Sequence, residues 1–117
     1  MNIDLTTFDK SRRGIGNGFD MRTSGVKPIT VIIHTTNGAK GSNFLNEANY
    51  IYNSNKIAAH YLVGKDGRIV QFLNPKYRAW HAGAVNDSRF NNNNSIGIEV
   101  HYTPGEGAWT SAMYNAL

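Results

Sequence analysis

Two side chains in this 117-residue sequence have the chemistry and the surroundings expected of a hydrolytic site, His34 and Glu99. His34 stands near the end of the apolar run 29–36, just before a glycine-rich loop, and α/β proteins place ligands outside such strand ends. Glu99 lies within a second apolar segment, where an unpaired carboxylate is costly unless it faces a cleft. An imidazole can bind a metal or carry a proton, and a carboxylate can act as a general base. For His34, the alternative is a core histidine held by a backbone hydrogen bond.

Three further residues could contact a ligand: His60, Trp80 and His81. The Trp80-His81 pair precedes Ala82 and Gly83, small residues that let a ligand approach closely, and an indole ring can stack on a sugar or a peptide. The alternatives are a core or rim aromatic for Trp80 and a half-buried strand histidine for His60.

The elements that must position these residues alternate between strands and helices. The run of β-branched residues in 29–36 predicts a strand buried on both faces, as in the centre of a sheet. Residues 59–64 and 68–73 flank Asp66-Gly67, which predicts an antiparallel hairpin. Residues 95–102 alternate in polarity, so Glu99 should share one face of a further strand with His101.

Two helices are expected between and after these strands. Ser42 can cap a helix whose apolar residues fall at helical spacing over 44–52. Thr110 can cap a short helix over 111–117, where the sequence stops without a Gly or Pro terminator. The fold class predicted is α/β, with a central mixed β-sheet flanked by helices.

Composition limits the number of domains and the range of partners. A chain of this length with 40% hydrophobic residues suits one domain, and we expect an N-terminal arm or loop over 1–27 before a domain over 28–117. No segment is long and apolar enough for membrane insertion, and the N-terminus lacks a secretory signal pattern. The net charge of +4 comes from scattered basic residues with no stripe, which argues against a nucleic-acid partner. The absence of cysteine excludes disulfides and thiolate ligands.

Four motifs occur together in a known order. They are residues 31–35 (VIIHT), 59–63 (AHYLV) with 66–71 (DGRIVQ), 78–83 (RAWHAG) and 94–99 (NSIGIE). In this order and spacing, the segment 28–102 resembles the N-acetylmuramoyl-L-alanine amidase type 2 family, which includes phage lysozyme-amidases and peptidoglycan recognition proteins.

The resemblance implies a zinc-dependent enzyme that cleaves peptidoglycan between N-acetylmuramic acid and the L-alanine of the stem peptide. His34 then matches a zinc ligand, and Glu99 matches the acidic residue that assists the metal-bound water. Trp80 and His81 match the rim of the substrate groove. His60 matches a strand position with a supporting or substrate-facing role.

The sequence departs from the family pattern at its C-terminal end. The family takes its second zinc histidine and an Asp or Cys ligand from a segment after the last long helix, and this sequence ends inside the expected helix. Only one of the three expected zinc ligands, His34, is therefore present, and the amidase-like domain should be incomplete there. A cluster of His34, His81 and His101 could complete a site internally as an alternative.

The expected function is a peptidoglycan hydrolase, most simply a phage or prophage endolysin that is made in the cytoplasm and reaches the wall on release. A cytoplasmic enzyme of muropeptide recycling is the nearest variant. The alternative class is a non-catalytic peptidoglycan-binding module with the same groove and no complete zinc site. A regulatory protein that binds another protein is a third class.

Overall fold

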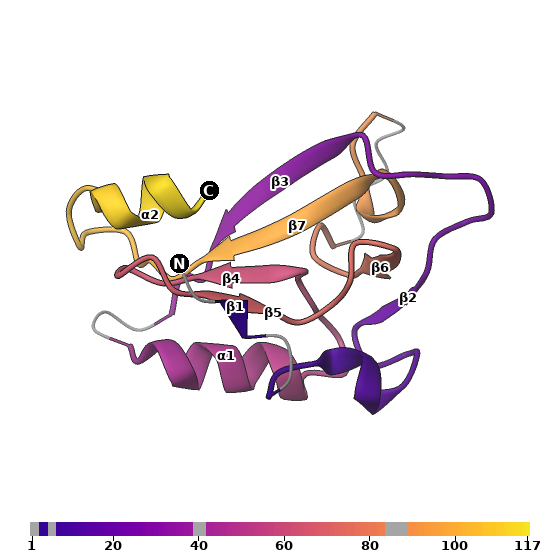
Figure 1. Cartoon of the computed structure of the whole chain (residues 1–117), viewed down its shortest axis with the longest axis horizontal. Coiled ribbons are helices and arrows are strands. Elements are labelled where there is room, and N and C mark those ends of the chain that lie inside the picture. Colours follow the sequence, from indigo (N-terminus) through magenta and orange to yellow (C-terminus); the bar gives the residue numbers. More distant parts are fainter. Residues whose placement is uncertain (1–2, 5–6, 39–41, 84–88) are drawn as a thin grey trace.

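A five-stranded mixed sheet forms the centre of the computed structural model, which describes residues 3–4, 7–38, 42–83 and 89–117 (Figure 1). The strand order is β1-β5-β4-β7-β3; β4 and β5 pair antiparallel and the other neighbours pair parallel. A separate antiparallel pair joins β2 to β6. The elements are β1 (Ile3–Asp4), the 3-10 helix η1 (Lys10–Arg13), β2 (Phe19–Met21), β3 (Thr30–Thr35), α1 (Phe44–Asn53), β4 (Tyr61–Val63), β5 (Ile69–Gln71), β6 (Tyr77–Ala79), the 3-10 helix η2 (Asn92–Asn94), β7 (Ser95–Val100) and α2 (Ser111–Ala116).

The predicted α/β class and the hairpin are confirmed. Tyr61, Leu62 and Val63 pair with Gln71, Val70 and Ile69, so the strands flank the Asp66-Gly67 turn as expected. Gly67 has a φ of +86°, a conformation that favours glycine, which explains why this dipeptide suits the turn.

The prediction that residues 29–36 form a central strand buried on both faces is wrong. β3 lies at the edge of the sheet, and Val31 and Ile33 are 50% and 48% exposed. A run of β-branched residues favours a strand, but it does not indicate whether one or both faces of that strand are buried by other elements. The side chains of Ile32 and His34 alternate to the opposite face, which is the face that carries the site.

The helices occur where the sequence predicts them, with one shifted cap. Asn43, rather than Ser42, caps α1, because its side-chain oxygen accepts the Leu45 N–H at 2.8 Å. Thr110 caps α2 as expected, accepting the Met113 N–H at 3.1 Å. Figure 1 shows α1 along one side of the sheet and α2 on the other. Within the described residues, no helix is long and apolar enough to cross a membrane.

The N-terminal residues are tied into the fold through the end of α1. Lys10 is fully buried, and its ammonium donates to the carbonyls of Ile51, Ser54 and Ile57 at 2.5, 2.8 and 2.7 Å. These carbonyls lie at and just after the last turn of α1, where intrahelical donors run out. Burial lowers the pKa of Lys10 to about 8, with a smaller effect from Arg13. Strand β1 then adds to the sheet beside β5.

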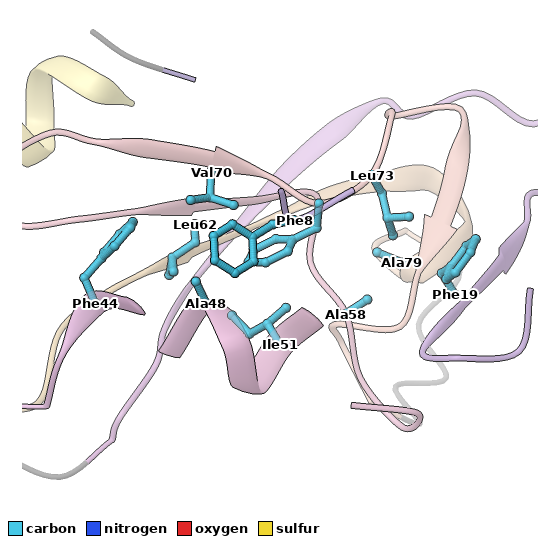
Figure 2. Packing of buried hydrophobic residues seen from close by; sticks show 11 residues of the cluster. Phe8, Phe19, Phe44, Ala48, Ile51, Ala58, Leu62, Val70, Leu73 and Ala79 are labelled. Atoms are coloured by element: carbon cyan, nitrogen blue, oxygen red, sulfur yellow. The ribbon is translucent and has the colours of Figure 1, made fainter. Parts of the chain in front are cut away.

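The hydrophobic core fills the space between α1 and the sheet (Figure 2). Ala48 and Ile51 of α1 face Leu62 of β4 and Val70 of β5, and Phe8 packs among them. The same side of the sheet continues toward β7 and β3, so the core and the candidate site lie on one surface of the sheet.

Candidate functional site

One row of paired residues carries the site across the sheet. His34 of β3 pairs with Glu99 of β7, which pairs with Leu62 of β4, which pairs with Val70 of β5. Paired residues in a sheet point to the same face, so the His34 and Glu99 side chains project side by side on the α1 side. The predicted association of His34 and Glu99 thus has a direct basis in strand register.

Three side chains form a hydrogen-bonded chain that ends at His34. Ser95 Oγ donates to the Asn91 carbonyl at 2.6 Å, which uses its only proton. The 3.0 Å contact between His81 Nε2 and Ser95 Oγ therefore requires that the imidazole donates. His81 Nδ1 is then the acceptor in its 3.0 Å contact with His34 Nε2, so His34 donates from Nε2. This assignment leaves Nδ1 as the nitrogen of His34 with an available lone pair.

Burial keeps both of these rings in the neutral form. Burial lowers the pKa of His34, and it lowers that of His81 to about 3, with smaller contributions from repulsion between a protonated His81 and His34, His60 or Arg22. A neutral imidazole is the form that binds a metal ion or accepts a proton.

Gly97 makes room for His81 over the sheet. A Cβ atom at Gly97 would lie 2.4 Å from His81 Cγ, so no other residue allows the ring to lie this close to β7. The backbone of the same loop is held by Asn92, whose Oδ1 accepts the His81 and Ala82 N–H groups at 3.1 and 2.8 Å. His81 is therefore fixed at both its backbone and its ring.

Glu99 is the most perturbed carboxylate of the site. Its Oε2 atom is buried without a hydrogen-bond partner among the described residues. Burial and, to a smaller extent, the nearby negative charge of Glu47 together raise the pKa of Glu99 from 4.5 to about 7. A carboxyl group with this pKa can both accept and release a proton near neutral pH.

His60 has the contacts of a structural residue. It is fully buried, Nε2 donates to the Tyr77 carbonyl at 2.9 Å, and Nδ1 accepts the Gly97 N–H at 3.0 Å. Burial lowers its pKa to about 4. With both nitrogens engaged by backbone, a substrate contact by His60 stays a prediction that this geometry does not favour.

Trp80 and His101 have partners that differ from those of the His34–His81 pair. Trp80 is half-buried, its backbone N–H donates to the Gly18 carbonyl at 2.9 Å, and its indole lowers the pKa of Asp20, whose main partner is Arg78. Its substrate contact also stays a prediction. His101 is buried, contacts Ser42 Oγ at 2.9 Å and faces Phe44. The described part of the chain contains no group of three His, Cys, Asp or Glu side chains placed to hold a metal ion.

Sequence reasoning missed Ser95, Gly97 and Asn92 as parts of the site. Ser95 and Gly97 belong to the motif over 94–99 that carries the resemblance, so their presence beside Glu99 was the available signal. Asn92 lies in a run of four asparagines, and nothing in such a run distinguishes the one that binds the His81 backbone.

Comparison with known proteins identifies the family of this chain. The family profile described as N-acetylmuramoyl-L-alanine amidase (Amidase_2) matches residues 24–117. The chain belongs to this family, which confirms the resemblance seen in the four motifs.

Sequence relatives include enzymes named 1,6-anhydro-N-acetylmuramyl-L-alanine amidase AmpD. The Salmonella typhimurium protein is 42% identical over 64 residues, and the Escherichia coli K12 protein is 40% identical over 67 residues. Each match covers 53% of this chain and 34% of the relative, so it spans about a third of the relatives' length.

Solved structures resemble nearly the whole chain. An AmpD crystal structure has a TM-score of 0.65 and 26% identity, covering 99% of this chain and 74% of that one. The PlyG catalytic domain has a TM-score of 0.66 and 26% identity, with coverages of 99% and 63%. The XlyA catalytic domain has a TM-score of 0.64 and 27% identity, with coverages of 99% and 71%.

Proposed function

We propose that this chain carries the histidine and carboxylate half of a peptidoglycan amidase site, which cleaves the amide between N-acetylmuramic acid and L-alanine. The observation that supports it most is the pairing of His34 with Glu99, whose Oε2 atom is buried without a partner among the described residues, in a chain of this family. A structural carboxylate would find donors for both oxygens in the fold, whereas a carboxylate with one unsatisfied buried oxygen and a pKa near 7 is typical of proton transfer.

Glu99 supplies the acid–base chemistry in this proposal. In its charged form it takes the proton of the attacking water, and in its protonated form it gives that proton to the departing amine of L-alanine. Such a group contributes about 10²- to 10⁴-fold to a rate. His34 lies beside it with Nδ1 available, and His81 fixes the orientation of that ring.

Zinc is the metal that we propose for the complete site, with His34 as one ligand. When bound, zinc polarises a carbonyl and lowers the pKa of water. The described residues do not fit a complete zinc site, because they provide no three-ligand group, so the role of Glu99 is derived without the metal. We expect this chain to bind zinc weakly; stoichiometric zinc that survives dialysis and is lost in His34→Ala would show further ligands within it.

Two substrates distinguish the biological settings. An endolysin releases stem peptides from intact peptidoglycan, whereas a recycling enzyme prefers soluble 1,6-anhydro-muropeptides, the substrate in the name of the AmpD relatives. We propose the endolysin setting, and the test is to incubate the protein with both substrates with and without zinc. New amino groups on L-alanine, absent in Glu99→Gln, support the amidase proposal; release from the soluble substrate alone contradicts the endolysin setting.

The binding-module alternative predicts contact without cleavage. Trp80, with His81 beside it, is the residue proposed for the peptidoglycan groove. NMR titration with a soluble muramyl peptide should then shift signals of residues 78–83, and Trp80→Ala should weaken those shifts while the fold is kept. If the native chain shows no shifts at millimolar ligand, the binding-module alternative fails.

A further inference from the structure

Arg22 is joined to the backbone around the site by an unusually dense set of hydrogen bonds. Its Nε and Nη2 donate to the Pro75 carbonyl at 3.0 and 2.9 Å, and Nη2 also donates to the Ser95 carbonyl at 2.8 Å. Nη1 donates to the carbonyls of Asn92 and Asn93 at 3.0 and 2.7 Å. One guanidinium thus binds four carbonyls from two separate segments of the chain.

These acceptors show that Arg22 organises backbone rather than forming an ion pair. No Asp or Glu of the described ranges lies within ion-pair distance of it. Next to it, the Thr23 N–H donates to Asn93 Oδ1 at 2.9 Å. The turn over 91–95 is therefore clamped to the segment that follows β2, and the planar five-donor geometry of arginine suits this task better than lysine.

The clamped turn is the same one that holds His81. Asn92 offers its carbonyl to Arg22 and its side-chain oxygen to the His81 N–H. Ser95 likewise offers its carbonyl to Arg22 and its hydroxyl oxygen to His81 Nε2. Two residues of the turn therefore connect the guanidinium to the ring that contacts His34.

We propose that Arg22 is a positioning residue of the site, which clamps the turn over 91–95 and so fixes the His81 ring that leaves His34 Nδ1 available for a ligand. Arg22 lies outside the family match over 24–117 and contacts no reacting group. The inference deepens the proposed function, on which its catalytic consequence rests, but the ring geometry does not depend on that function.

The test reads the protonation of individual ring nitrogens. Long-range 15N–1H NMR on 15N-labelled protein distinguishes protonated from bare imidazole nitrogens, and it needs neither metal nor substrate. The native protein should show His81 and His34 protonated at Nε2. Arg22→Lys and Arg22→Ala should lose these fixed signals and give averaged shifts at both histidines, while His60, held by backbone, keeps its own.

Arg13 provides the matched control. Its guanidinium donates to the carbonyls of Tyr52 and Ser54 at 3.1 and 3.3 Å, at the far end of α1. Arg13→Ala should lower stability without changing the His34 and His81 signals. Asn92→Ala keeps the carbonyl that binds Arg22 but removes the side-chain oxygen that binds the His81 N–H. It should change the His81 signals as the Arg22 variants do. It replaces those variants in the test if they do not fold.

The outcomes separate the inference from the proposed function. A folded Arg22→Lys or Asn92→Ala variant with unchanged ring signals, or native protein with His81 protonated at Nδ1, overturns the positioning role. Where amidase activity is measured, Arg22→Lys should lower kcat about 10- to 100-fold with little change in KM, and Arg13→Ala should not. Altered ring signals in a protein that lacks amidase activity would support the positioning role and contradict the proposed function.

Discussion

The two ends of the row that crosses the sheet have opposite surroundings. At the β5 and β4 end, Val70 and Leu62 are buried against the apolar side of α1 and need no polar partner. At the β7 and β3 end, Glu99 has a buried oxygen without a partner, and His34 contacts a second imidazole. All four residues point to the same face of one sheet, with neighbours in the row about 4.8 Å apart across the strands.

This difference shows that one end of the row stabilises the fold, whereas the other end carries the groups proposed for catalysis. Burial of Leu62 stabilises the fold, because each apolar side chain removed from water contributes about 1.5 to 3 kcal/mol. Burial of a charged Glu99 opposes folding, since desolvation disfavours the ionised carboxylate. The apolar end therefore supplies the stability that holds an unfavourable carboxylate in place at the other end.

The largest effect expected is on turnover at the polar end. Glu99→Gln keeps the shape of the side chain but removes the basic oxygen, so it should lower kcat on purified peptidoglycan about 10²- to 10⁴-fold in protein that shows amidase activity. The fold, measured by circular dichroism, should be unchanged. An unaltered kcat would make Glu99 a structural carboxylate.

At the apolar end the expected effect is on stability. Leu62→Ala should lower the free energy of unfolding by about 2 to 5 kcal/mol, because it leaves a cavity between α1 and the sheet. Ile33→Ala, at a side chain that is 48% exposed, is the control and should cost about 1 kcal/mol or less. Denaturant unfolding compares the two, and similar losses would contradict the unequal burial of the two faces.

The pH dependence of stability should reveal the cost of Glu99. Its pKa rises from 4.5 to about 7 on folding, so the folded protein keeps a proton that the unfolded chain releases between these pH values. The free energy of unfolding should therefore fall as pH rises through this window, by at most about 3 kcal/mol. The difference between native protein and Glu99→Gln isolates this effect, because His60 and His81, whose lowered pKa values reduce stability below pH 6.5, are common to both. A difference that does not change with pH would refute the unpaired state of Glu99.

A smaller effect is expected from Gly97, which lies in β7 on the same face as Glu99. Gly97→Ala should push the His81 ring away from β7, since the new Cβ would lie 2.4 Å from Cγ, and should cost about 1 to 3 kcal/mol. The His34 and His81 ring signals should change with it. Ile96→Ala, whose side chain points to the opposite face, should leave those signals as they are.

Sequence patterns predicted where the helices and strands lie better than they predicted how exposed those elements are. The hairpin around Asp66-Gly67, the two helices and the strand predicted over 95–102, which forms as β7 over Ser95–Val100, depend on local spacing, which the sequence contains in full. The edge position of β3 depends on strand order, and no local pattern in an apolar run specifies its neighbours. Strands β1 and β2 are two and three residues long and, unlike the similarly short β4 and β5, do not flank an Asp-Gly turn that marks them in the sequence.

The same limit applies to the candidate site. His34 and Glu99 could be selected from residue type and surroundings, and the family motifs assigned His81 to the rim of the substrate groove. The contact between His81 and His34 joins residues 47 positions apart through a loop, and the Arg22 clamp reaches 70 positions or more to the turn over 91–95. Such contacts depend on how distant segments meet, so they had to come from the fold.

The edge position of β3 also affects how the protein behaves in concentrated solution. The strand TVIIHT is six residues long, has no Lys, Arg, Asp or Glu, and pairs on one side with β7. Its outer N–H and C=O groups can template a strand from another molecule, and the half-exposed Val31 and Ile33 add an apolar surface beside them. Self-association and aggregation during refolding should therefore begin at β3, and a lysine at Val31 would oppose both without touching the face that carries His34.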